Sequence, residues 1–365
     1  MKTYYRFLIL IIFILSALLC RRVPTDVYPE DQLWRFSTPE EQGMDSRILN
    51  TAFDQAKSKD FIDGLLVIRN GYIVGEQYYN GYDANKPHNI MSVSKSFLSA
   101  ITGIALEKGY IDNLDEKILD YFPEYVTRDM DLRKYDITIR HLLSMRMGIR
   151  GESEDNYGVY FNLYQSDNWV KSALEAPLVS NPGENMGYNT FQTHLLSAIL
   201  TKATRQSLLD FATENLFQFM KIDIDEWERD PQGIYFGGNS MFFTLREMAM
   251  LGYLYLNQGM LNGMQIIPRE WIELTLSAST NLKHPNEWGA FKNYDYAYLW
   301  WLGQVNEVSL YMGYGYGGQF VVVFPELNLI IVSIARNEVD PDTSTVQEWA
   351  LFDIISNSIL PSVFD

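Results

Sequence analysis

A serine and a lysine stand three residues apart at the start of an apolar segment, in the run Ser92-Val93-Ser94-Lys95. On a helix this spacing brings the hydroxyl and the amine to one face. An amine that is held neutral can accept the hydroxyl proton, and the serine then becomes a nucleophile. Serine and lysine are common residues, so a solvated lysine is the ordinary alternative for this tetrapeptide taken alone.

The surrounding sequence predicts elements that would position this pair. Residues 64–69 and 72–79 are rich in β-forming side chains and flank Asn70-Gly71, which predicts a hairpin. Downstream of Ser92, apolar residues recur at helical spacing as far as Gly109, a residue suited to the end of a helix. We therefore expect Ser92 at a helix N-terminus, where backbone N–H groups and the positive dipole end face the nucleophile.

Two further segments combine loop chemistry with a buried element. Residues 181–190 begin as a turn-forming stretch and contain Tyr188 where an apolar helix starts. Residues 313–319 are glycine-rich and run into the apolar strand predicted at 318–324. Glycines at the entry of a buried strand often mark close approach by a ligand or another backbone. Taken singly, the two segments are equally consistent with a structural tyrosine and a glycine-rich hairpin.

Together these segments resemble the serine β-lactamase and penicillin-binding-protein superfamily, in its class C and esterase-like branch. Within that branch the chain is most similar to the 6-aminohexanoate-dimer hydrolases. The likeness extends from residues 37–44 through 137–145 and 236–240 to the predicted last helix. Three ordered motifs at the family's spacing make this resemblance far more specific than the tetrapeptide.

The resemblance implies roles for individual residues. Ser92 corresponds to the nucleophile, Lys95 to the helix-borne amine and Tyr188 to the tyrosine of the Tyr-x-Asn motif. The backbone N–H groups of Ser92 and Gly318 would form the oxyanion hole. A lysine titrates near pH 10.4, so neutrality at pH 7 requires a fall of about three units, through desolvation or a nearby cation. The sequence leaves open whether Lys95 or Tyr188 takes the hydroxyl proton.

Two departures from the family pattern concern the substrate. Thr190 stands where the motif has its asparagine, and Gly315-Tyr316-Gly317 stands where relatives carry Lys-Thr-Gly or His-x-Gly. We expect Thr190, Gly315, Tyr316 and Gly317 at the substrate-binding site. A strand motif without Lys or His argues against β-lactamase activity and leaves acyl transfer intact.

Other catalytic classes have weak support. The four histidines show no metal-ligand spacing and a single cysteine offers no zinc pair, so we expect no metal and no cofactor. The nearest approach to Gly-x-Ser-x-Gly, at residues 238–242, lacks its last glycine. A formal net charge of −17 argues against nucleic acid and anionic lipid as partners, and it suits an enzyme with a small-molecule substrate.

The N-terminus reads as a targeting segment. Residues 1–20 have a short basic start and an apolar stretch that is short for a membrane span but typical of a signal peptide. Cys20, the only cysteine, follows directly and suggests lipidation at that residue. Leu19 fits this less well, because a small residue is expected there; an uncleaved anchor followed by Arg21 and Arg22 is the alternative. We expect an exported protein of the periplasm or cell envelope that meets the membrane only through this segment.

The remaining sequence reads as a short tether, residues 21–36, followed by one catalytic domain, residues 37–365. Strands are predicted early, and again at 296–304, 308–312, 318–324 and 329–335. Helices are predicted at 138–147, 193–203, 208–219 and 345–360. Strands at both ends around a helical middle indicate an α+β fold. We predict a β-lactamase/transpeptidase-like fold, in which an antiparallel sheet is flanked by helices (about 37–115 and 233–365) and carries a largely helical inserted part (about 116–232).

These observations favour an exported serine hydrolase that cleaves an amide or ester through an acyl-enzyme on Ser92. The alternatives are a class C-type β-lactamase or D-amino-acid peptidase, and a catalytically silent penicillin-binding-like protein. The joint presence of Ser92, Lys95 and Tyr188 argues against the silent protein.

Overall fold

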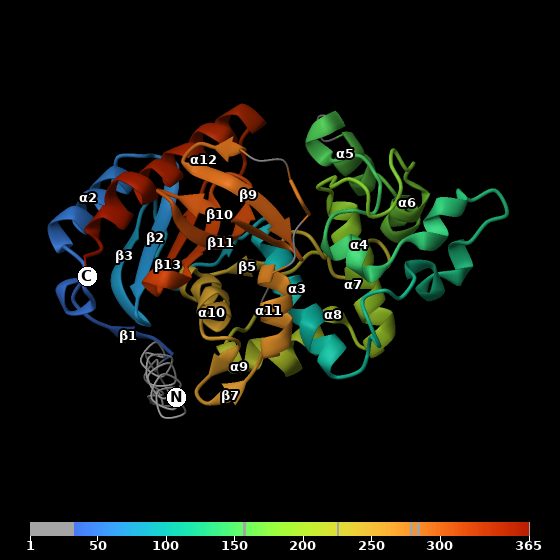
Figure 1. The fold of residues 1–365 in the computed structure, drawn as a ribbon, viewed down its shortest axis with the longest axis horizontal. Helices are drawn as coiled ribbons and strands as arrows, with labels where there is room; N and C mark the ends of the chain where they lie inside the picture. The colour runs from blue at the N-terminus through green and yellow to red at the C-terminus, as the bar shows by residue number, and fades with distance from the viewer. Residues whose placement is uncertain (1–32, 156–157, 225, 278–279, 283–284, 365) are drawn as a thin grey trace, which may run out of the picture.

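A nine-stranded sheet forms the centre of the computed structural model, which describes residues 33–155, 158–224, 226–277, 280–282 and 285–364. The strands follow the order β1-β3-β2-β13-β12-β11-β10-β9-β8. Neighbouring strands are antiparallel, except that β1 and β3 pair in parallel. Early strands and late strands therefore meet in one sheet (Figure 1), as the sequence predicts.

The elements have the following bounds. The sheet contains β1 (Arg35–Phe36), β2 (Ile62–Arg69), β3 (Tyr72–Tyr78), β8 (Glu287–Trp288), β9 (Phe291–Ala297), β10 (Trp300–Val305), β11 (Val308–Gly315), β12 (Gln319–Phe324) and β13 (Leu329–Ala335). Two short pairs lie outside it, β4 (His88–Asn89) with β5 (Phe242–Phe243), and β6 (Met260–Leu261) with β7 (Met264–Gln265). The α-helices are α2 (Ser46–Lys57), α3 (Val93–Glu107), α4 (Ile139–Leu143), α5 (Gly158–Tyr164), α6 (Trp169–Glu175), α7 (Thr190–Thr204), α8 (Leu208–Ala212), α9 (Gln218–Met220), α10 (Leu245–Leu256), α11 (Arg269–Ser277) and α12 (Pro341–Ile354).

Alternating side chains along the central strands divide the interior into two cores. On β12, Val321 and Val323 belong to the core that includes α3, α7 and α10, whereas Val322 belongs to the core under α2 and α12. Successive side chains of a strand point to opposite faces, so a strand buried on both faces is apolar throughout. Figure 1 shows α2 and α12 together on one side of the sheet and α10 and α11 on the other.

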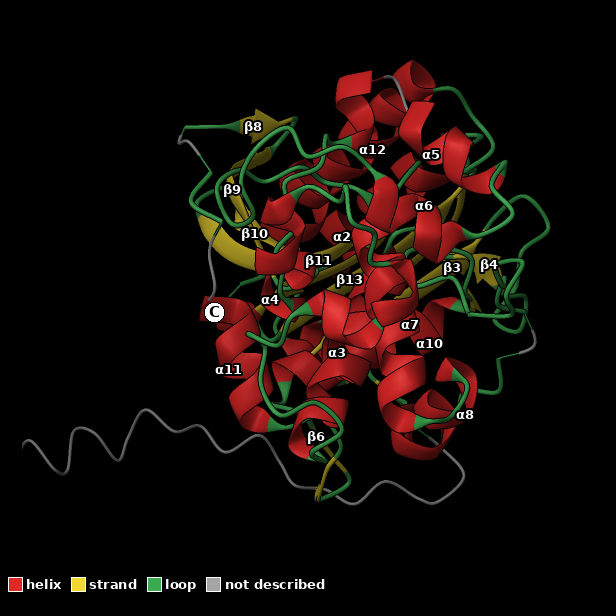
Figure 2. Ribbon diagram, turned by 90° about the vertical axis from the view of Figure 1, so that its right-hand side faces the viewer, coloured by secondary structure: helices red, strands yellow, loops and turns green. Residues whose placement is uncertain are grey.

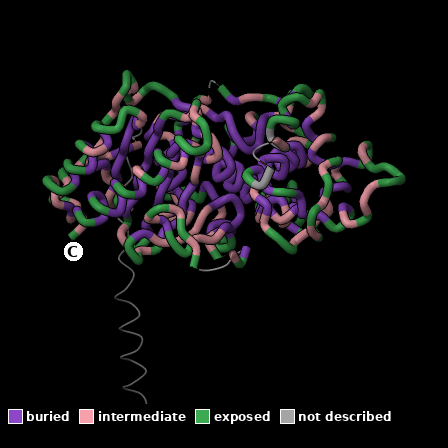
Figure 3. The backbone as a smooth tube through the Cα atoms, turned by 90° about the horizontal axis from the view of Figure 1, so that it is seen from above, coloured by how far each residue is buried: buried purple, intermediate pink, exposed green. Residues whose placement is uncertain are grey.

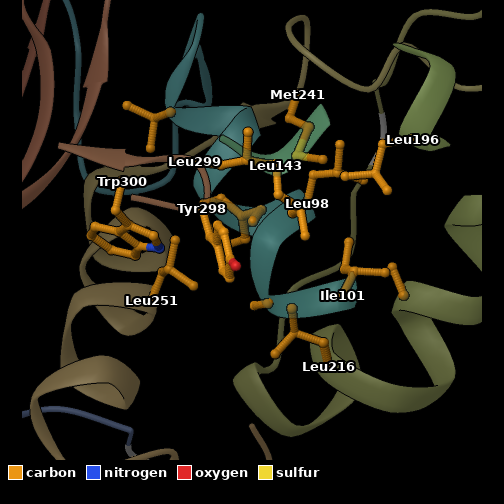
Figure 4. Packing of buried hydrophobic residues seen from close by; sticks show 14 of the residues in the cluster. Leu98, Ile101, Leu143, Leu196, Leu216, Met241, Leu251, Tyr298, Leu299 and Trp300 are labelled. Carbon is orange, nitrogen blue, oxygen red and sulfur yellow. The ribbon is translucent and has the colours of Figure 1, made fainter. Parts of the chain in front are cut away.

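Helix α3 joins the sheet to the helical part of the molecule. Its residues Val93 to Ala105 are all buried, because the sheet packs on one side and α7 on the other. Figure 4 shows Leu98 and Ile101 of α3 among Leu143, Leu196 and other apolar side chains. The helical elements α4 to α8 face the viewer in Figure 2, and the buried backbone is continuous through the middle of the molecule in Figure 3.

The hairpin and the nucleophile helix agree with the sequence prediction. Strands β2 and β3 pair across Asn70 and Gly71, whose φ angles of 53° and 82° are the positive values that such a turn requires. Helix α3 begins directly after Ser92, and Gly109 follows it with φ of 73°. The predicted α+β arrangement of a sheet flanked by helices is confirmed, while its division into two parts near residues 115 and 233 stays a prediction.

The structure differs from the predicted boundaries in three main places. The strand expected at 296–304 is the end of β9, a tight turn and the start of β10. Tyr298 and Leu299 form that turn with positive φ angles, and both are buried, so no polar turn residue marks it. The helix expected at 138–147 ends at Leu143, since Met145 takes a left-handed conformation. The expected tether includes Arg35–Phe36, which pairs with β3 as β1.

The N-terminal predictions lie outside the described residues. The signal segment, Cys20, Arg21 and Arg22 all fall within residues 1–32. Within the part that the structure describes, none of the helices combines the length and the apolar character needed to cross a membrane.

Candidate active site

The backbone turns sharply just before Ser92. Met91 has φ of 49°, and its N–H donates to the side-chain oxygen of Asn89 at 2.9 Å. A positive φ is unusual for a residue other than glycine and often marks a functional site. Ser92 itself already has helical angles, and its hydroxyl makes no capping hydrogen bond to the helix. The half-buried Ser92 hydroxyl is therefore available for chemistry at the N-terminus of α3.

The Lys95 amine has three hydrogen-bond partners. Nζ lies 2.8 Å from Ser92 Oγ, 3.2 Å from Thr190 Oγ1 and 2.8 Å from the carbonyl oxygen of Gly238. The side chain is 1% exposed. The amine is thus fixed among α3, the start of α7 and the 236–240 segment, one helical turn from the serine that the sequence predicts as nucleophile.

The chemistry of the partners decides how the proton can move. The Gly238 oxygen can only accept a hydrogen bond, so Nζ must donate to it. A neutral amine could donate its second hydrogen to Thr190 and keep its lone pair for the Ser92 hydroxyl. Burial lowers the pKa of Lys95 from 10.5 to about 8, against the opposing effect of the Glu152 carboxylate. At pH 7 about a tenth of the molecules would carry the neutral amine.

Tyr188 lies beside this amine. The Lys95 Nζ atom is 5.1 Å from the centroid of the Tyr188 ring. The ring stacks on Trp301 of β10 at 5.9 Å between centroids and meets Tyr296 of β9 edge-on. The structure thus brings Ser92, Lys95 and Tyr188 together, and aromatic side chains of the sheet hold the tyrosine.

Thr190 contacts the predicted base directly. It is the first residue of α7, is 2% exposed and meets Lys95 Nζ through its hydroxyl. The sequence predicts Thr190 as a substrate-binding residue, whereas its contact in the structure is with Lys95. Its position supports a role in holding the amine.

The glycine-rich segment is a strand end followed by a turn. Gly315 is the last residue of β11, and a Cβ atom there would lie 2.7 Å from the Ile90 oxygen and 3.1 Å from Met91 Cβ. A side chain at Gly315 would displace the backbone that leads into Ser92. This close approach explains why a glycine stands at position 315.

Gly317 and Gly318 point away from this contact, contrary to the sequence prediction. The Gly318 N–H donates to the Gly315 oxygen at 3.2 Å, and a Cβ atom on Gly318 would meet Leu351 of α12. Gly317 N–H donates to Ser344 Oγ and to Glu348 Oε1, both on α12. The Gly318 amide is therefore engaged within the turn, and the Gly317 amide is engaged by α12.

Tyr316 lies between the two glycine positions. Its hydroxyl donates to the Val339 oxygen at 2.8 Å, so the side chain is anchored on the segment after β13. The Tyr316 amide follows Gly315, the position at which an added Cβ atom would meet Ile90 and Met91.

Two residues of the site, Gly238 and Glu152, have no role that the sequence predicts. Gly238 lies in the quoted segment 236–240, but nothing local shows that its carbonyl meets a lysine 143 positions earlier. Glu152 is buried against the start of α7, yet it begins an ordinary acidic stretch that reads as solvated surface. The paired glycines at 237–238 are the sequence feature that could have pointed to a close approach here. In the structure a Cβ atom on Gly238 would overlap Thr190.

Among the described residues, no group of three or more His, Cys, Asp or Glu side chains is arranged to hold a metal ion. The site that the structure describes combines the Ser92 and Thr190 hydroxyls, the Lys95 amine, the Tyr188 phenol and the Gly238 carbonyl.

Comparison with known proteins identifies the family. A sequence model of the family described as Beta-lactamase matches residues 55–353. The chain belongs to this family. Its relatives in this family include hydrolases, and the chain has the β-lactamase/transpeptidase-like fold.

Three relatives of this Beta-lactamase-family chain illustrate how similar it is to known proteins in sequence and structure. The 6-aminohexanoate-dimer hydrolase of Paenarthrobacter ureafaciens is 24% identical over 307 residues, covering 80% of this chain and 76% of the relative. The structure of a candidate 6-aminohexanoate-dimer hydrolase from Bacillus anthracis is 22% identical with a TM-score of 0.70, covering 91% and 89%. EstCE1, a hydrolase with promiscuous acyltransferase activity, is 15% identical with a TM-score of 0.65, covering 87% and 98%. At these identities the structural matches show the fold alone.

Proposed function

We propose that this protein is a serine hydrolase that cleaves an amide or ester bond of a small molecule through an acyl-enzyme on Ser92. The observation that carries the proposal is the 2.8 Å contact between Ser92 Oγ and the buried amine of Lys95. A hydroxyl next to a base of lowered pKa is the usual arrangement of an activated nucleophile. The names of the relatives, an amide hydrolase and a hydrolase with acyltransferase activity, support the same reaction class.

In the proposed acylation, Ser92 Oγ attacks the substrate carbonyl carbon while its proton passes to Lys95 Nζ. The carbonyl oxygen becomes an oxyanion, which the Ser92 amide would stabilise. Collapse of the tetrahedral intermediate breaks the bond to the leaving amine or alcohol, which takes a proton from Lys95 directly or through Tyr188. Water then attacks the acyl-enzyme with the same groups as base and acid.

The surroundings of Tyr188 favour uncharged substrates. Trp301, Tyr294 and Tyr314 are half-buried aromatic residues that cluster on the sheet side of Tyr188. The segment from Gly315 to Gly317 contains no Lys or His, the residues that the family resemblance leads one to expect there. Without that cation the site lacks one means of binding a substrate carboxylate, so we propose short uncharged esters and linear amides as substrates.

The experiment that tests this function is covalent labelling. The purified protein is treated with a fluorophosphonate, digested and mapped by mass spectrometry, and a chromogenic ester assay follows the loss of activity. A phosphonyl group on Ser92, appearing in step with inactivation, is the expected result. Inactivation with the label on another residue, or a fully active labelled protein, would reject the proposal.

We also propose that the protein is exported and lipid-anchored at Cys20. The support is the sequence of residues 1–20 alone, with its basic start, apolar stretch and terminal cysteine. An export route of this kind is compatible with a chain that carries a single cysteine and cannot form a disulfide within itself.

A further inference from the structure

Glu152 is a buried carboxylate next to the proposed base, and the reaction described above does not use it. The residue is 7% exposed and opens the short 3₁₀ turn Glu152–Asp155. Its Oε1 atom accepts the Thr190 N–H at 2.5 Å, and its own N–H donates to the Tyr188 oxygen at 2.9 Å. Glu152 is therefore hydrogen-bonded to the backbone of both Tyr188 and Thr190.

These contacts connect the carboxylate to the nucleophile through a short path. Glu152 holds the backbone of Thr190, the Thr190 hydroxyl meets Lys95 Nζ at 3.2 Å, and Nζ meets Ser92 Oγ. A buried carboxylate is costly unless hydrogen bonds or a charge partner compensate it. The Thr190 N–H at the positive end of α7 supplies one such bond, and an ammonium on Lys95 would supply the charge.

We propose that Glu152 is a positioning residue of this site, which fixes Thr190 against Lys95 and stabilises the ammonium that forms when Lys95 takes the Ser92 proton. The inference rests on the proposed function of Ser92 and Lys95. In this step the Ser92 O–H bond breaks and an N–H bond forms on Lys95, while Glu152 neither gains nor loses a proton. The carboxylate would thus act on the lysine through Thr190 and through its charge, whereas the aspartate of a Ser-His-Asp triad bonds the histidine directly.

Opposing influences act on the Lys95 amine. Burial lowers its pKa and the Glu152 charge raises it, so loss of that charge should lower it further. Other titratable groups on the elements packed around Lys95 include Tyr188, Tyr314 on β11, and the His194–Asp230 pair joined to α7. Glu228 also belongs to this set, because its carboxylate accepts the Ser240 hydroxyl at 2.8 Å on the segment that carries Gly238.

The test measures how fast a fluorophosphonate labels Ser92 as a function of pH. Wild type, Glu152→Gln and the control Glu228→Gln are compared between pH 5.5 and 10, with melting temperatures recorded for each. The glutamine oxygen at position 152 can still accept the Thr190 N–H, so this variant removes the charge and keeps the bond. The labelling rate should rise with a midpoint near pH 8 in wild type, since Lys95 must be neutral.

Glu152→Gln should move that midpoint down by about one pH unit, because the lost negative charge no longer favours the ammonium. Its plateau rate should fall several-fold, because a weaker base drives the proton transfer less strongly. Glu228→Gln should keep the wild-type midpoint. An unmoved midpoint in folded Glu152→Gln, or an equal shift in Glu228→Gln, would overturn the inference.

Two further results keep the test decisive. If the wild-type protein is not labelled on Ser92 at any pH, the proposed function itself is rejected. If the wild type is labelled normally and Glu152→Gln has the wild-type pH midpoint, only the role of Glu152 is rejected. If Glu152→Gln does not fold, Glu152→Asp retains the charge one methylene further back. That variant should lower the midpoint by a smaller amount, and an unchanged or raised midpoint would contradict the role.

Discussion

The carbonyl oxygen of Gly238 accepts a hydrogen bond from Lys95 Nζ at 2.8 Å, although the two residues are 143 positions apart. A Cβ atom at position 238 would lie 2.4 Å from Thr190 Cγ2 and 3.2 Å from Nζ. Only glycine allows the carbonyl, the threonine and the amine to approach so closely. This contact fixes the direction of the lysine side chain toward Ser92 before any substrate arrives.

Lys95→Ala and Tyr188→Phe should each reduce kcat/KM for an ester substrate by about 10²- to 10⁴-fold, the range typical of lost acid–base catalysis. The control is Lys134→Ala, which removes another buried lysine whose amine donates to the Leu174 oxygen. That variant should lose stability and keep the kcat of its folded fraction. If both site variants kept more than about half of the wild-type rate, the base would have to lie elsewhere.

Activity should rise with pH as Lys95 loses its proton. The pKa of this buried amine is lowered to about 8, and the reactive neutral form predominates above that value. The ascending limb of kcat/KM against pH should therefore have its midpoint near 8, with a loss of about tenfold per unit well below it. Stopped-flow or plate assays with a pH-insensitive ester will show this limb. A midpoint near 10.5, or a rate independent of pH between 6 and 9, contradicts a buried lysine base.

Substrate choice should follow the missing cation of the β11 motif. The protein should turn over p-nitrophenyl butyrate with a higher kcat/KM than a chromogenic cephalosporin, whose carboxylate would gain roughly 1.5–3 kcal/mol from a charged partner that this motif lacks. Both rates are measured on one purified sample, with Ser92→Ala as the blank. A cephalosporin rate tenfold above the ester rate would instead support the class C-type β-lactamase alternative.

The mature N-terminus should begin at a lipid-modified Cys20. Mass spectrometry of protein purified from the membrane fraction should show a diacylglyceryl group on that residue, and Cys20→Ser should release or mislocalise the protein. A mature chain that retains Met1, or one cleaved beyond Cys20, would refute the lipoprotein proposal.

Local patterns made part of this structure predictable. Asn70-Gly71 between β-rich segments predicts the β2–β3 hairpin because a two-residue turn needs positive φ angles that these residues tolerate. The Ser92–Lys95 spacing predicts a shared helix face, and the structure has the two side chains in contact. In both cases the residues that interact are neighbours in sequence.

Long-range packing made the remainder unpredictable. Tyr298 and Leu299 form a turn that is recognisable only from its burial against the rest of the molecule; Tyr298, for example, stacks on Trp271. Glu152 reads as surface because its partners at 188 and 190 are distant in sequence. The placement of Gly317 and Gly318 at the site could not be judged from the sequence for a related reason. The Gly317 amide binds α12, which is distant in sequence, and the Gly318 amide is engaged by the turn itself.

Replacement of Ser92 by alanine tests the central claim most directly. Because Ser92 makes no capping bond, Ser92→Ala should melt close to wild type. It should lose fluorophosphonate labelling and more than about 10³-fold of its ester hydrolysis, as removal of a catalytic nucleophile does in serine hydrolases. A folded Ser92→Ala protein that hydrolysed the ester at near wild-type rate would contradict the acyl-enzyme mechanism.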